Sequence, residues 1–230
     1  MSNTSRFDPG LWAVVPIKNF DRAKERLAGI LTASERQSLF TAMLEDVLQT
    51  LSQCPALTGI VLVTREPQAQ ILGQRYGARS LIEQSNLGHT AASTLGARSL
   101  AANKGTSMLQ LPADVPLIKP DDINALILAH GNGPAITLAP SRDHRGSNAV
   151  LCTPPDLLPL QFGDDSFTPH LAASRALNIE PAVVERPGLA LDIDTPDDLV
   201  ALLETPSATR TYDYLRSSGI DKRLFDQQKN

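Results

Sequence analysis

Apolar residues along this chain follow two periods, one typical of buried strands and the other of helices that cover a sheet. The unbroken apolar run at 59–64 predicts a strand that is covered on both faces. Thr32 and Glu35 predict a capping box, and behind them Leu, Phe, Met and Val recur at helical spacing as far as Cys54. Such patterns predict strands at 13–15, 59–64, 78–82, 108–111, 134–139, 147–153 and 181–185, and helices at 33–53, 67–76, 89–102, 120–129, 167–177 and 196–203.

The alternation of strands and helices predicts a three-layer α/β fold with a largely parallel sheet. Residues 134–190 break this rhythm, which indicates an inserted hairpin or antiparallel strand that forms the second substrate's half of a site. We expect an N-terminal extension at 1–10, one domain at 11–204 and a polar tail at 205–230. The tail is expected to form a short helix near 212–217 and then to fray.

The composition is that of a soluble globular protein and argues against several kinds of partner. The 230 residues carry a net charge of −4, whereas a nucleic-acid-binding domain is expected to be basic. No apolar run approaches the roughly 20 residues that cross a bilayer, and the N-terminus lacks a signal-peptide core. Cys54 and Cys152 lack metal-ligand spacing and are expected to be buried thiols. We therefore expect a cytoplasmic protein that binds small molecules, with neither nucleic acid nor membrane as a partner.

A cluster of cations follows the first predicted strand, which Pro16 is expected to end. Lys18, Arg22, Lys24 and Arg26 fall within nine residues. Because α/β proteins bind ligands at the carboxyl ends of their strands, this cluster predicts a polyphosphate site. The alternative is a strand followed by a solvated basic loop.

Three carboxylates stand at further predicted strand ends. Asp114 follows the strand at 108–111, and Asp192 and Asp194 are two residues apart, so that in an extended segment both point the same way while Ile193 points into the core. Converging carboxylates repel one another unless a cation lies between them, and Mg²⁺ prefers such oxygen ligands. The alternative for Asp192 and Asp194 is a signal for the start of the next helix. A metal opposite a basic cluster indicates nucleotidyl transfer.

Four motifs together resemble the guanylyltransferases of coenzyme F420 biosynthesis, of the CofC/FbiD type. They are Val-Val-Pro-Ile-Lys at 14–18, Ala-Lys-Glu-Arg-Leu at 23–27, Leu-Pro-Ala-Asp-Val-Pro at 111–116 and Leu-Asp-Ile-Asp-Thr-Pro at 191–196. The resemblance covers about residues 11–203. It implies a GT-A-type nucleotidyltransferase fold, GTP as donor, Mg²⁺ as cofactor, and a phosphorylated three-carbon acid as acceptor. Arg-Gly-Ser-Asn at 145–148 and Phe-Gly-Asp-Asp-Ser at 162–166 also resemble elements of this family.

The resemblance implies a role for each candidate site residue. The roles are catalysis for Lys18, Lys24 and Asp114; nucleotide binding for Pro16, Lys18, Lys24, Arg26, Asn86 and Gly88; substrate binding for Asn148, Gly163 and Ser166; and metal binding for Asp114, Asp192 and Asp194. For Ser166 the alternative is a helix cap, and for Asn148 it is a turn.

One segment departs from the family. A Gly-Leu-Asn-x-Ala-like loop is usual before the third helix, and this chain has Ser-Asn-Leu-Gly-His-Thr-Ala at 85–91 instead. The acceptor is left open among 2-phospho-L-lactate, phosphoenolpyruvate and 3-phospho-D-glycerate, although Asp143, His144 and Arg145 favour an acid with a free hydroxyl. The competing interpretations are a molybdopterin guanylyltransferase, a sugar-phosphate nucleotidyltransferase and a non-catalytic nucleotide-binding protein. A homodimer with contacts through the tail also stays open.

Overall fold

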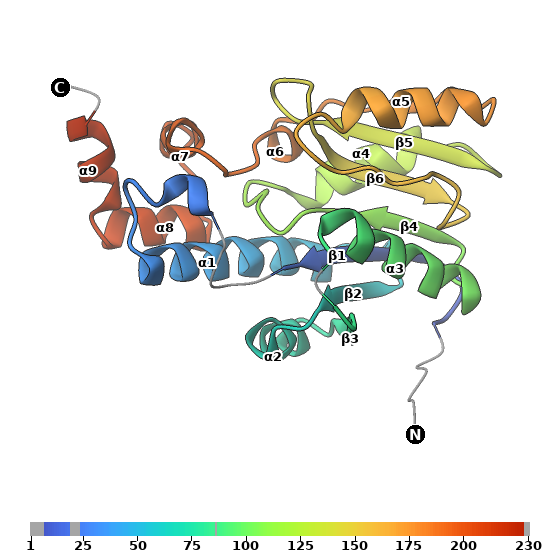
Figure 1. Cartoon of the computed structure of the whole chain (residues 1–230), viewed down its shortest axis with the longest axis horizontal. Helices are drawn as coiled ribbons and strands as arrows, with labels where there is room; N and C mark the ends of the chain where they lie inside the picture. The colour runs from blue at the N-terminus through green and yellow to red at the C-terminus, as the bar shows by residue number, and fades with distance from the viewer. Residues whose placement is uncertain (1–6, 19–23, 86, 228–230) are drawn as a thin grey trace.

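A seven-stranded mixed sheet organises the computed structural model, which describes residues 7–18, 24–85 and 87–227 (Figure 1). The strand order is β3-β2-β1-β4-β6-β5-β7. The first four strands in this order are parallel, β6 is antiparallel to both β4 and β5, and β7 is parallel to β5. The strands are β1 (Leu11–Ile17), β2 (Gly59–Thr64), β3 (Arg79–Leu81), β4 (Ser107–Gln110), β5 (Ala135–Pro140), β6 (Ser147–Thr153) and β7 (Ala182–Val183). The predicted mostly parallel mixed sheet and its antiparallel insertion are both confirmed.

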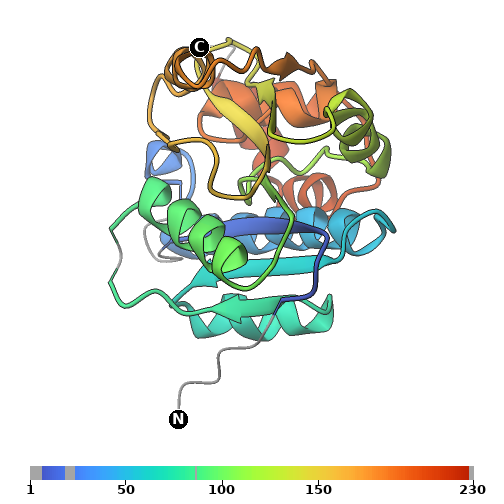
Figure 2. The ribbon, with the colours of Figure 1, turned by 90° about the vertical axis from the view of Figure 1, so that its right-hand side faces the viewer.

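Helices cover both faces of the sheet and form the three expected layers (Figures 1 and 2). One face packs against α1 (Ala33–Ser52), α2 (Pro67–Arg75) and α4 (Pro120–Ala129), and the other against α3 (His89–Ala102) and α5 (Phe167–Ala176). Successive side chains of β1 point to opposite faces of the sheet and so contribute to both halves of the core. Ala13 and Val15 face the α1 side, and Trp12 and Val14 face the α3 side. All five helices begin within one residue of the predicted positions.

The first strand continues through Pro16, contrary to the prediction that this residue ends it. The reason lies in the register: β4 pairs only with Leu11–Val14, while β2 pairs as far as Ile17. Beyond Val14, β1 therefore has a strand neighbour on one side alone, where a residue without an N–H is tolerated. The extension carries β1 up to the first residue of the basic cluster. Of the remaining strands, β3 and β7 are shorter than predicted.

The C-terminal segment is folded, which corrects the expectation that it frays after one short helix. It forms α8 (Arg210–Ser217) and α9 (Ile220–Gln227), which lie beside α1 and α7 (Pro196–Leu203), as Figure 1 shows. Leu215 and Ile220 are fully buried in the core on the α1 side. The buried carboxylate of Asp46 accepts hydrogen bonds from the backbone N–H groups of Arg210 and Thr211 and so anchors the start of α8. The segment is therefore part of the folded unit.

Two further sequence expectations concern thiols and membranes. Cys54 and Cys152 are buried and free, as predicted. None of the helices that the described residues form combines the length and the apolar character needed to cross a bilayer.

Candidate active site

One edge of the sheet gathers the predicted site residues. The carboxyl ends of the parallel strands β1 to β4 lie at this edge. Gln110 at the end of β4 pairs with Val150 at the middle of the antiparallel β6, so the first half of β6 extends beyond the end of β4. The β5–β6 turn therefore reaches the same edge. So does the segment between α6 (Pro187–Ala190), a short helix that the sequence did not reveal, and α7.

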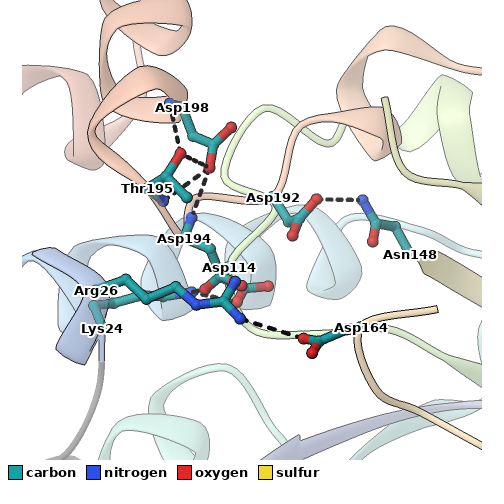
Figure 3. A network of polar contacts seen from close by, with 9 residues as sticks. All are labelled: Lys24, Arg26, Asp114, Asn148, Asp164, Asp192, Asp194, Thr195 and Asp198. Carbon is teal, nitrogen blue, oxygen red and sulfur yellow. Dashed lines mark hydrogen bonds and ion pairs between the residues drawn. The ribbon is translucent and has the colours of Figure 1, made fainter. Parts of the chain in front are cut away.

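Lys24 joins two of the predicted metal ligands. Its Nζ donates to Asp114 Oδ2 at 2.5 Å and to Asp194 Oδ1 at 2.7 Å (Figure 3). Burial opposes the charge of this ammonium, but the two carboxylates outweigh burial and raise the pKa of Lys24 above its ordinary value. The backbone also connects the two acidic segments, since Ile193 N–H donates to Asp114 O at 3.0 Å. Carboxylates far apart in the sequence thus meet at one point, as predicted.

Asp192 lies on the same side of its segment as Asp194. Both line a cavity, and Ile193 between them is fully buried, which confirms the predicted alternation. Burial, and to a lesser degree the nearby charge of Asp114, raise the pKa of Asp192 to about 6. Asn148 Nδ2 donates to Asp192 Oδ1 at 3.0 Å, as Figure 3 shows. The same nitrogen also donates to Leu189 O at 2.8 Å. Asn148 therefore orients an acidic side chain.

The donor set fits a divalent cation chemically. Asp114 Oδ1 is buried without a hydrogen-bond partner among the described residues, and Asp192 resists ionisation beside other carboxylates. A bound cation would remove both penalties, and all of the donors are hard oxygen atoms. Within the described part of the chain, however, no three Asp, Glu, His or Cys side chains are close enough together to hold an ion. In this structure the ammonium of Lys24 takes the position between Asp114 and Asp194.

A cavity of about 430 Å³ opens beside these acids, and guanidinium groups line it. Arg26 pairs with Asp164 at 3.2 Å across the cavity, and Arg142 pairs with Asp198 at 3.1 Å. Hydrogen bonds from the Ser141 hydroxyl and from the Arg145 backbone N–H lower the pKa of Asp143. The charge of Arg145 lowers this pKa further, by a smaller amount. The cavity is lined by Arg26, Ser141, Arg142, Asp143, Arg145, Gly146, Gly163, Asp164, Ala190, Leu191, Asp192, Asp194, Thr195 and Asp198.

Ser166 holds the rim of this cavity in place. Its Oγ accepts the backbone N–H of Ser147 at 2.8 Å, and its own N–H donates to Arg145 O at 2.8 Å. The Ser166 side chain is buried at the start of α5, so it links that helix to β6. Gly163 does line the cavity, and a Cβ built there would meet nothing within 4 Å.

The other half of the edge carries three of the predicted nucleotide-binding residues, namely Pro16, Lys18 and Gly88, whereas Lys24 contacts the acids and Arg26 lines the cavity. Pro16 is buried within β1, and Lys18, the residue that follows the end of this strand, is exposed. Gly88 precedes α3 with a φ of +98°, a conformation that suits glycine, and a Cβ there would point into open space. Asn86 lies outside the described residues, as do Arg22 and Ala23 of the basic cluster.

Sequence reasoning did not select His89, the first residue of α3, as a site residue. Its Nε2 accepts a hydrogen bond from Gln110 Nε2 at 2.9 Å. Burial, with smaller contributions from the charges of Lys18 and Lys24, lowers the pKa of His89 to about 3, so the imidazole is neutral. The local feature that could have pointed to His89 is its position at the start of a helix, directly after a glycine, where anions are commonly bound.

A family model described as "Guanylyl transferase CofC like" matches residues 11–229. The chain belongs to this family. It is 36% identical over 192 residues to the phosphoenolpyruvate guanylyltransferase of Rubrobacter xylanophilus, covering 84% of this chain and 93% of the relative. It is 34% identical over 195 residues to the 3-phospho-D-glycerate guanylyltransferase of Colwellia psychrerythraea, covering 84% and 92%.

Solved structures support the same fold for this CofC-like chain. A protein from Desulfovibrio desulfuricans G20, assigned to the nucleotide-diphospho-sugar transferases, superposes with a TM-score of 0.76 at 15% identity. The match covers 94% of this chain and 97% of that protein. The predicted GT-A-type nucleotidyltransferase fold is confirmed.

Proposed function

We propose that this protein is a Mg²⁺-dependent guanylyltransferase that transfers GMP from GTP to a phosphorylated three-carbon acid and releases pyrophosphate. The observation that carries the proposal is the meeting of Asp114 and Asp194 on Lys24 beside a cavity lined by arginines. The names of the relatives supply the reaction class and two candidate acceptors, phosphoenolpyruvate and 3-phospho-D-glycerate. 2-Phospho-L-lactate is the third candidate. We assign the reaction to coenzyme F420 biosynthesis in the cytoplasm.

The proposed reaction requires the negative charges of two phosphates to be neutralised, one on the acceptor and one on GTP. A phosphate oxygen of the acceptor attacks the α-phosphorus of GTP, and the bond to the bridging oxygen breaks with both electrons leaving on pyrophosphate. The protein needs no covalent intermediate for this step, because alignment and cations lower the barrier. Lys18, Lys24 and Arg26 supply cations at the carboxyl end of β1, where the triphosphate would lie.

We propose that Asp114, Asp192 and Asp194 would hold the magnesium ion, which requires these carboxylates to come closer together than they lie in this structure. A divalent ion held there would supply charge neutralisation for the reacting phosphates. The buried, unpartnered Oδ1 of Asp114 and the disfavoured charge of Asp192 support this assignment. The ammonium of Lys24 balances Asp114 and Asp194 in this structure. We propose that Lys24 turns to a phosphate oxygen once a divalent cation takes over those carboxylates.

The cavity beside the acids suits an acceptor that carries a carboxylate and a phosphate. Arg142 and Arg145 line it, and Gly163 leaves its backbone accessible there. Asn148 and Ser166 serve this subsite indirectly, the former through Asp192 and the latter by fixing the rim of the cavity. The free hydroxyl that Asp143 and Arg145 favour is present in 3-phospho-D-glycerate.

A pyrophosphate-release assay with GTP, Mg²⁺ and each of the three acids tests the proposal. Wild-type protein is expected to release pyrophosphate with at least one acid, and Asp114→Asn and Asp194→Asn are expected to abolish release while the proteins stay folded. Full activity in both variants contradicts the metal assignment. Thermal shifts with GTP, CTP, UTP and ATP test the base, and selective stabilisation by CTP or UTP would favour a sugar-phosphate-type nucleotidyltransferase instead.

A further inference from the structure

Charged residues follow the ends of three neighbouring parallel strands. Ile17 at the end of β1 pairs with Thr64 of β2, and Val63 of β2 pairs with Leu81 of β3. Continued by one position along β1 and β2, and by two along β3, this register brings Lys18, Arg65 and Glu83 into one row across the edge. The row begins at the phosphate-binding end of the site and ends in a carboxylate that the proposed chemistry does not use.

Glu83 is buried in a loop in which residues 82, 84, 85 and 87 are exposed. It is 5% exposed, whereas the apolar Ile82 and Leu87 on either side are 54% and 76% exposed. Burial raises the pKa of Glu83, and the charges of Arg65 and Lys18 oppose this only in part. Among the described residues, neither cation forms an ion pair with Glu83. A buried carboxylate in such a setting is costly unless donors from a ligand reach it.

The position of Glu83 relative to Lys18 suits a nucleobase. Strands lie about 5 Å apart, so β3 is about 10 Å from β1, which is also the reach of a nucleotide from its α-phosphate to the far edge of its base. The arginine-lined cavity occupies the opposite side of the edge, next to β5 and β6. A nucleotide whose phosphates face both Lys18 and the acids therefore extends towards β3. The exposed side chains of Ile82 and Leu87 offer apolar contacts of the kind that a base requires.

We propose that Glu83 selects guanine by accepting hydrogen bonds from its N1–H and its 2-amino group, so that this one carboxylate determines the base specificity of the enzyme. The inference rests on the proposed guanylyltransferase function. Guanine presents two adjacent donors on this edge, and a carboxylate can accept both. Hypoxanthine lacks the 2-amino group, adenine lacks the N1–H, and xanthine has a carbonyl oxygen in place of the amino group.

The test compares kcat/KM for GTP with kcat/KM for xanthosine triphosphate, in the wild-type protein and in the variant Glu83→Gln. A glutamine amide has nearly the same shape, accepts from N1–H and donates to the xanthine oxygen. The variant is expected to lose about tenfold to a hundredfold in kcat/KM for GTP and to gain as much for xanthosine triphosphate. The wild-type protein is expected to use inosine triphosphate about tenfold less well than GTP, since one of the two bonds is missing.

Damage to the fold would lower activity with both nucleotides and leave their ratio unchanged, so an unchanged ratio overturns the inference. Equal use of GTP and inosine triphosphate by the wild-type protein overturns it as well. Glu180→Gln, at an exposed glutamate that pairs with Arg175 far from this edge, is the matched control and should keep the wild-type ratio. Titrations of the same nucleotides without an acceptor measure base selectivity by itself. Selective binding of GTP without pyrophosphate release would contradict the proposed function and not the role of Glu83.

Discussion

Replacing Lys24→Met removes the ammonium that joins Asp114 and Asp194 and leaves the length of the side chain nearly unchanged. A hydrogen bond to a charged group contributes about 1.5 to 3 kcal/mol. The bond to Asp114 contributes nearly this whole amount to the free energy of unfolding, because the Lys24 and Asp114 side chains are only 5% and 21% exposed. Asp194 is 44% exposed, so its pair is screened by solvent and contributes less. We expect the free energy of unfolding to fall by about 3 kcal/mol in metal-free buffer, which lowers Tm by about 6 to 12 °C.

The loss arises because two carboxylates remain without a counter-charge, and this gives the prediction two further readouts. Asp114→Asn in the Lys24→Met background should restore at least about 1 kcal/mol, so that a double-mutant cycle shows coupling. Mg²⁺ alone should raise Tm more in Lys24→Met than in the wild-type protein, because no ammonium competes for the carboxylates. Lys222→Met, at an exposed lysine on α9, is the control and should change neither quantity.

Urea unfolding followed by circular dichroism, with and without EDTA, measures these effects. A loss below about 0.5 kcal/mol together with an additive double-mutant cycle would refute the reasoning, because the ammonium of Lys24 would then not stabilise the two carboxylates. An equal response to Mg²⁺ in variant and wild type would refute the competition between ammonium and metal.

Three other predictions concern pH, packing and the C-terminal segment. The pKa of Asp192 is raised from 3.8 to about 6, so between these values the folded state binds the proton more tightly than the unfolded state. In EDTA, stability from this group therefore falls as pH rises from about 4 to about 6, and Asp192→Asn should flatten that dependence in urea unfolding between about pH 4 and 7. Gly188→Ala should lower Tm and activity together, because its Cβ would clash with Asp122 Oδ2 and with the backbone oxygen of Leu117 and so displace α6, which precedes Asp192. Deleting 206–230 should give aggregated protein in gel filtration, since it uncovers the core around Leu215; a soluble, folded truncation would contradict this packing.

Local signals explain why most elements of the fold could be predicted. The capping box of Thr32 and Glu35 forms as expected at the start of α1, because both partners lie within one turn. The alternation at Asp192, Ile193 and Asp194 likewise depends only on extended backbone. Pro16 was misjudged because the tolerance of a proline in β1 depends on where β4 ends, and that is a property of the assembled sheet.

Long-range pairing explains what the sequence could not reveal. The basic cluster and the acids were each visible, but the contacts from Lys24 to Asp114 and Asp194 span 90 and 170 residues. The sequence predicts that Asn148 binds substrate, but it does not reveal that the Asn148 amide donates to Asp192 across 44 residues. The polar composition of the C-terminal segment hid the few apolar side chains that anchor it, because burial there depends on the surface of α1.

A crystal structure with GTP and Mn²⁺, in which anomalous scattering locates the metal, tests the central claim most directly. The account predicts a metal peak bound by Asp114 and by at least one of Asp192 and Asp194, with Lys24 turned towards a phosphate. A bound nucleotide whose metal lies away from Asp114, while Lys24 still pairs with both carboxylates, would contradict it.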